Sequence, residues 1–123
     1  MDDILKKMHV KTGMRLAYVD LDGVLKPYLD AQTTAVIVED DADVVMGLVL
    51  AKKDVDACVE QMKAKRKPGS NIWMVYPKAK KGFKPDVNRD ILFAYTQERH
   101  QLIANGNIAL DEDYSMLRFK DLI

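Results

Sequence analysis

Two carboxylates close the first strongly apolar stretch of the sequence. Residues 15–19 favour a strand buried on both faces, and Asp20 and Asp22 follow it directly. A carboxylate can attack an electrophilic atom and a carboxylic acid can protonate a leaving group, so paired acids can divide these two tasks. Asp and Gly are also common turn residues. Asp20 and Asp22 are therefore candidates either for catalysis or for shaping the turn that contains Gly23.

The segment Asp20-Leu-Asp-Gly-Val-Leu25 resembles the first motif of haloacid-dehalogenase-type phosphohydrolases. The resemblance implies that Asp20 is the nucleophile, that Asp22 is the general acid and that magnesium lies between them. That family also needs a lysine and a further acidic pair on later strands. Here Asp40 and Asp41 precede any suitable lysine. A magnesium-dependent phosphohydrolase is thus one alternative, with Asp20 and Asp22 as its catalytic and metal-binding residues.

Other candidate residues follow later strands. Residues 72–76 are the most apolar pentad and hold the only tryptophan, which predicts a central strand with Trp73 in the core. Pro77 cannot donate to a sheet ladder and should end this strand, releasing Lys78 into a basic loop. Ligands of open α/β sheets bind beyond the carboxyl ends of the strands. The ligand-binding candidates at strand ends are Glu39, Tyr76, Pro77 and Lys78.

A broader series of motifs spans most of the chain. It comprises Pro68-Gly69, then Trp73-Met-Val-Tyr-Pro-Lys78, then Asn88-Arg89-Asp90, and Tyr114-Ser-Met-Leu-Arg118. The series resembles an uncharacterised bacterial family with a domain of unknown function, in which tryptophan is expected at position 114. No activity comes with that resemblance. It adds Arg89 and Arg118 to the ligand-binding candidates, although both could instead form ion pairs with Asp86, Asp90 or Asp113.

The layout of that family is similar to a trimmed S-adenosylmethionine-dependent methyltransferase core. Binding this cofactor would require a glycine-rich turn after the first strand, where the backbone approaches the ligand. Gly23 is the only glycine there, whereas Glu39 follows the second strand, where an acid would bind ribose hydroxyls. A small S-adenosylmethionine-binding protein is the second alternative, and a fold without the cofactor is favoured over it.

Strands and helices alternate along the chain, which predicts βαβ units and right-handed crossovers. The fold class expected is a three-layer α/β domain, Rossmann-like but reduced, with a mostly parallel sheet and an antiparallel C-terminal edge. One domain should cover residues 1–123. The expected strands are 15–19, 33–38, 44–50, 72–76, 108–110 and 115–119. The expected helices are 2–8, a weak one ending at Leu29, one capped by Asp54 and stopped by Pro68-Gly69, and one capped by Asp86 and ended by Asn105-Gly106.

The net charge is zero, but the charges are unevenly distributed. Residues 20–60 carry ten acids and three bases, whereas residues 61–85 carry eight bases and no acid. Such segments could pair across a homodimer or meet a protein partner, while the absence of a nucleic-acid motif disfavours that class. One cysteine and no apolar run of about 20 residues indicate a cytoplasmic protein without a membrane span.

Taken together, the residues favour a non-catalytic binding or interaction module without a cofactor. The magnesium phosphohydrolase and the methyltransferase-like protein remain open as enzyme alternatives. They differ in what they need, since the first requires a lysine ammonium beside Asp20 and the second an open cavity beside Gly23 and Glu39.

Overall fold

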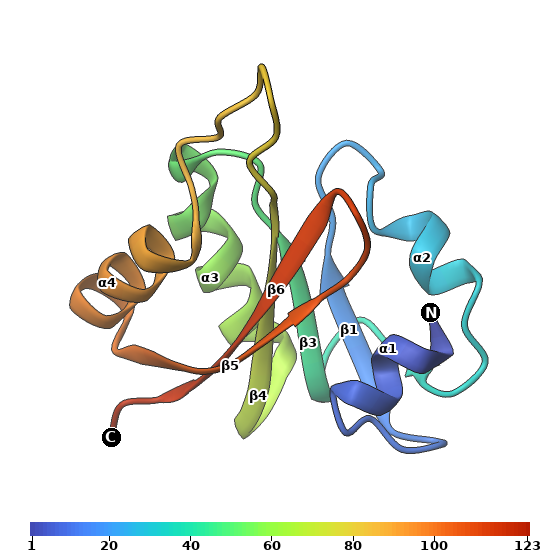
Figure 1. Ribbon diagram of the computed structural model, residues 1–123. Coiled ribbons are helices and arrows are strands. Elements are labelled where there is room, and N and C mark those ends of the chain that lie inside the picture. The colour runs from blue at the N-terminus through green and yellow to red at the C-terminus, as the bar shows by residue number, and fades with distance from the viewer.

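A six-stranded sheet runs through the computed structural model, which describes residues 1–123 (Figure 1). The strand order is β2-β1-β3-β4-β6-β5. In chain order the elements are α1 (Asp2–Lys7), β1 (Arg15–Val19), α2 (Lys26–Asp30), β2 (Val36–Ile37), β3 (Ala42–Leu48), the 3-10 turn η1 (Lys52–Asp54), α3 (Val55–Lys65), β4 (Arg66–Pro77), α4 (Arg89–His100), β5 (Leu102–Ala109) and β6 (Tyr114–Asp121).

Five of the six strands run in the same direction, and β6 is reversed. β1 pairs in parallel with β2 and β3, and β3 pairs in parallel with β4. β6 is antiparallel to both β4 and β5, so β5 runs in the same direction as β4. The predicted Rossmann-like α/β class, mostly parallel with antiparallel pairing at the C-terminal side, is confirmed. The reversed strand lies inside the sheet, and β5 forms the outer edge.

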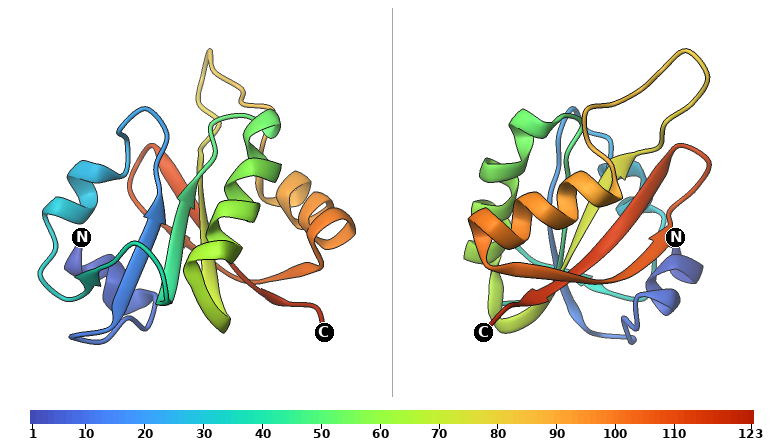
Figure 2. Two further views of the ribbon diagram at one scale, coloured as in Figure 1. Left: turned by 180° about the vertical axis from the view of Figure 1, so that it is seen from behind. Right: turned by 60° about the vertical axis from the view of Figure 1, so that its left-hand side comes forward.

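Helices cover both faces of the sheet, as Figure 2 shows: α1 and α2 lie on one face, α3 and α4 on the other. Alternate residues of each strand therefore enter two separate cores. Trp73 is 2% exposed and packs in the core under α1 and α2, which confirms its predicted burial. Cys58 of α3 is buried in the other core. None of the helices is long and apolar enough to cross a membrane.

β2 is shorter than predicted, and the chain after it has no helix. Only Val36 and Ile37 form the strand, and β3 begins at Ala42. The intervening segment crosses the start of β1, where the Arg15 side chain donates to the carbonyl oxygen of Asp41 at 3.1 Å. We call this side of the sheet the amino edge, and the side where β1, β2, β3 and β4 end the carboxyl edge.

The last helix is shorter than the sequence predicts. The Asn88 side chain caps it by accepting a hydrogen bond from the Ile91 amide at 2.8 Å. Asp86, the predicted cap, instead accepts from the Lys52 amide at 2.8 Å. The helix ends at His100, because Gln101 adopts a left-handed conformation with φ 57°. The predicted helix end at Asn105-Gly106 is therefore wrong.

Asn105 and Gly106 lie within β5, where the register against β6 shifts between Ala104 and Gly106. Such a shift is a β-bulge, which bends the strand. Arg118 of β6 donates to the Asn105 side chain at 2.9 Å and to its carbonyl oxygen at 3.1 Å. The bulge is thereby fixed to the neighbouring strand.

Candidate functional site

The turn after β1 is organised by the side chain of Asp20. One of its carboxylate oxygens accepts hydrogen bonds from the amides of Leu21 and Leu25, both at 2.8 Å, and the other accepts from the Lys26 amide at 3.0 Å. These bonds join the end of β1 to the start of α2. A carboxylate that accepts three amide hydrogen bonds is stabilised in place and has little freedom to attack a substrate.

Asp22 extends the same turn but takes no part in these bonds. It is exposed and adopts the left-handed conformation with φ 56°, which Asp tolerates better than most residues. The Lys26 ammonium pairs with Asp30 at 2.7 Å, and no lysine pairs with Asp20. No group of three His, Cys, Asp or Glu side chains is placed to hold a metal ion. This geometry gives the phosphohydrolase alternative no support.

The same turn decides how well S-adenosylmethionine would fit. Three amides of this turn, those of Leu21, Leu25 and Lys26, are already bonded to Asp20. Gly23 adopts a positive φ of 68°, and a side chain there would meet no protein atom within 4 Å. The cavity between β1, β3 and α3 measures about 150 Å³, below the roughly 300–1,000 Å³ of ordinary ligand pockets. The cavity beside this turn is therefore smaller than the space that such a cofactor usually occupies.

Glu39 lies far from this turn, at the amino edge. Lys65, the last residue of α3, donates to the Glu39 carbonyl oxygen at 3.2 Å, and its ammonium lies 3.9 Å from the carboxylate. Since α3 starts at the carboxyl edge and runs back along the sheet, its last residue marks the opposite edge. The expected grouping of Glu39 with Asp20 is therefore wrong, because β2 is too short to carry Glu39 to the carboxyl edge.

A second cavity at the carboxyl edge, of about 400 Å³, lies where β4 ends and β6 begins. We call it the β4–β6 cavity. Its walls combine apolar side chains, two aromatic rings and three charges. The lining residues are Leu50, Pro77, Lys78, Lys80, Phe83, Asp113 and Tyr114.

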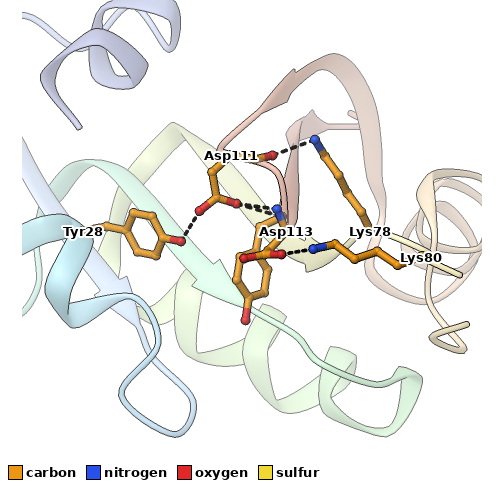
Figure 3. Close-up of polar contacts among 6 residues, drawn as sticks. Tyr28, Lys78, Lys80, Asp111 and Asp113 are labelled. Atoms are coloured by element: carbon orange, nitrogen blue, oxygen red, sulfur yellow. Dashed lines mark hydrogen bonds and ion pairs between the residues drawn. The ribbon is translucent and has the colours of Figure 1, made fainter. Parts of the chain in front are cut away.

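A network of polar contacts supports this cavity, as Figure 3 shows. Asp111, in the turn between β5 and β6, accepts a hydrogen bond from the Tyr28 hydroxyl of α2. Its other carboxylate oxygen accepts from the amides of Asp113 at 2.8 Å and Tyr114 at 3.0 Å. Burial alone would raise the pKa of Asp111, but these hydrogen bonds and the nearby Lys78 outweigh it and lower the pKa. Burial and the bond to Asp111 raise the pKa of Tyr28.

Lys78 is the charged group of this cavity without an ion-pair partner. Its ammonium donates to the main-chain oxygen of Asp111 at 2.6 Å, and its amide donates to the Asp113 carbonyl oxygen at 2.8 Å. Lys80, in contrast, forms an ion pair with Asp113. The lining thus has one positive charge in surplus, on a half-buried side chain. Buried charges are normally paired, so this ammonium favours an anionic ligand.

The remaining predicted residues do not join this cavity. Tyr76 is buried on the opposite face of β4, in the core with α3 and α4, and burial raises its pKa. Arg89 starts α4 and contacts the neighbouring Asp90 carboxylate at 3.5 Å. Arg118 lies in the middle of β6, with its guanidinium 5.8 Å from the centroid of the Trp73 ring. Of the eight candidates, only Pro77 and Lys78 line the β4–β6 cavity.

Sequence reasoning missed Tyr28, Phe83, Asp111 and Tyr114 as parts of a site. Asp111 carries a local signal, because an Asp that opens a tight turn commonly binds amides two and three residues later. Its contact with Tyr28 joins residues 83 positions apart, and no local pattern reports such a pairing.

No family model matches this chain, and no curated protein matches it. Solved structures do match. The chain is similar to an S-adenosylmethionine-dependent methyltransferase from Aquifex aeolicus (TM-score 0.65, 11% identity, covering 97% of this chain and 88% of that one). It is also similar to a putative type 11 methyltransferase from Sulfolobus solfataricus (TM-score 0.55, 11% identity, 99% and 91%) and to an NADB-Rossmann superfamily protein from Streptococcus agalactiae (TM-score 0.55, 12% identity, 95% and 67%).

At such low identity these likenesses concern the fold. They confirm the methyltransferase-like layout, while the resemblance to the bacterial family with a domain of unknown function stays a prediction. The chain has a methyltransferase-like, Rossmann-type fold.

Proposed function

We propose that this methyltransferase-like protein is a binding module for a small organic anion, which it holds in the β4–β6 cavity. The single observation that carries the proposal is the half-buried Lys78 ammonium, which faces a main-chain oxygen but no ion-pair partner. The Asp111 carboxylate acts on this ammonium without forming an ion pair, and an anionic group of a ligand would supply a direct countercharge. The position also agrees with the general rule that open α/β sheets bind ligands beyond their carboxyl ends.

The other walls narrow the class of ligand. Leu50 and Pro77 are apolar, and the rings of Phe83 and Tyr114 lie near them. The Tyr114 hydroxyl makes no hydrogen bond within the protein and remains free to donate one; its pKa is raised, chiefly by burial and then by Asp113 and Asp111. The volume of about 400 Å³ suits a small molecule. We therefore favour a phosphate or carboxylate that carries a flat ring, as in a nucleoside monophosphate.

Calorimetric titration with adenosine monophosphate and with inorganic phosphate tests this proposal. Lys78→Met should weaken binding of the nucleotide at least about tenfold, because it removes the unpaired charge. Lys81→Met is the matched control: this lysine lies in the same loop, is exposed and does not line the cavity. Equal affinity of the two variants, or no binding of either ligand to the wild type, would contradict the proposal.

A second candidate function is S-adenosylmethionine binding, which the fold of the similar structures favours over a module unrelated to methyltransferases. The turn held by Asp20 argues against it. S-adenosylhomocysteine, titrated into wild type and Lys78→Met, separates the two functions. Binding that survives Lys78→Met would support a cofactor site elsewhere on the carboxyl edge.

A further inference from the structure

β5 forms the outer edge of the sheet, beside α4 (Figure 2). It pairs only with β6. The Leu110 amide donates to the Tyr114 carbonyl oxygen at 3.0 Å, and alternate residues back along β5 repeat this paired position. The main-chain groups of Asn107 and Ala109 therefore point outward, where this chain provides no partner.

This edge lacks most of the protection that exposed strands usually have. Lysine, proline and short length are the common devices that prevent pairing with another chain. Residues 101–110 contain no charged residue and no proline, and the strand has eight residues. Its one protective feature is the bulge at Asn105, and the register is regular from Gly106 to Ala109. The opposite edge, β2, has only two residues.

A groove of about 480 Å³ runs between this strand and α4. Phe93 of α4 lines it and is 41% exposed, and Leu117 lies beside Phe93 in the lining. Arg89 and Asp90 add one charge of each sign. Two such grooves brought face to face would therefore bury apolar surface without net repulsion.

We propose that β5 pairs antiparallel with β5 of a second copy of this chain, which makes a homodimer with a continuous sheet. Among protein partners, a strand suits these free main-chain groups, since it offers matching donors and acceptors in a row. A two-fold pairing sets residue i of one copy against residue j of the other and j against i, and no like charges meet in it because the strand is uncharged. This proposal does not depend on the ligand of the β4–β6 cavity.

Sedimentation equilibrium between about 1 and about 200 µM tests the proposal, since specific dimers commonly dissociate in or below this range. The wild type should approach twice the 14.0 kDa mass of one chain. Ala109→Lys adds a charge at an exposed edge position, and Asn107→Pro removes an outward amide; each should raise the dissociation constant at least about tenfold.

Val36→Lys is the matched control, because it adds the same charge to the opposite edge at a residue that is 51% exposed. This variant should still form the dimer. A monomer at every concentration would overturn the proposal and leave the edge to another protein. A dimer that Ala109→Lys leaves intact would also overturn it, and that substitution keeps the test valid even if Asn107→Pro disturbs the fold.

Discussion

The turn after β1 and the end of β4 lie at the same edge of the sheet, and a sequence motif singles out a charged residue in each. Around Asp20, three main-chain amides satisfy the carboxylate. Around Lys78, one carbonyl oxygen meets the ammonium, and no acidic side chain forms an ion pair with it. Position at a strand end is thus common to both residues. What separates a structural charge from a candidate binding charge is how many direct partners the protein itself provides for it.

The largest expected effect tests the structural half of this comparison. Asp20→Ala should lower the free energy of unfolding by about 2–3 kcal/mol, because it leaves the amides that join β1 to α2 without acceptors. Urea denaturation followed by circular dichroism measures this change. The control is Asp22→Asn, which changes an exposed residue in the same turn and should shift stability by less than about 0.5 kcal/mol. Equal stability of the two variants would remove the distinction between Asp20 and Lys78.

A smaller loss of stability is expected at the contact that joins the turn after β1 to the β4–β6 cavity. Tyr28→Phe removes the hydroxyl that links α2, which Asp20 starts, to Asp111 behind the β4–β6 cavity. We expect a loss of about 1 kcal/mol, because Asp111 is half-buried and keeps its two amide partners. Thermal and urea unfolding check this value. A loss as large as that of Asp20→Ala would mean that the contact with Tyr28, rather than the turn, holds α2 in place.

The smallest expected effect is a change in the free energy of unfolding at low pH. The pKa of Asp111 is lower in the folded protein than its ordinary value of about 3.9, so its contribution to stability is complete above that pH. The contribution is lost as the pH falls through the lower, folded-state pKa. The difference in unfolding free energy between wild type and Asp111→Asn should therefore narrow from pH 5 to pH 2. A constant difference over this range would show that the charge of Asp111 is irrelevant to the cavity wall.

Periodicity and turn residues predicted the layers of this fold well, since apolar runs at 15–19 and 72–76 do form buried strands. Errors arose where one local signal serves two structures. Asn105-Gly106 suits the end of a helix but also a bulge, and Pro68-Gly69 lies inside β4, where the register against β3 is irregular. The cap of α4 was ambiguous as well, because Asp86 and Asn88 are both good N-cap residues. Asn88 caps the helix, and Asp86 binds the Lys52 amide, which only the folded chain brings close to it.

The candidate site was harder to predict than the fold. Pro77 and Lys78 were correctly expected at a strand end, because proline terminates the ladder there. The bonds of Asp20 could not be anticipated, since a carboxylate after a strand suits both a catalyst and a cap. Glu39 was placed at the wrong edge because the length of β2 depends on pairing with β1, which shows no clear pattern in the sequence.

The place of β6 between β4 and β5 has a consequence for synthesis of the chain. β5 has no other partner within the sheet, so it cannot join the sheet until residues 114–121 have left the ribosome. Until then β4 lacks a partner strand on one side, and β5 has no hydrogen bonds to any other strand. Exposed strand edges of this kind favour aggregation and recruit chaperones. Completion of the sheet is therefore a late event, in which β6 inserts between two strands that precede it in the chain.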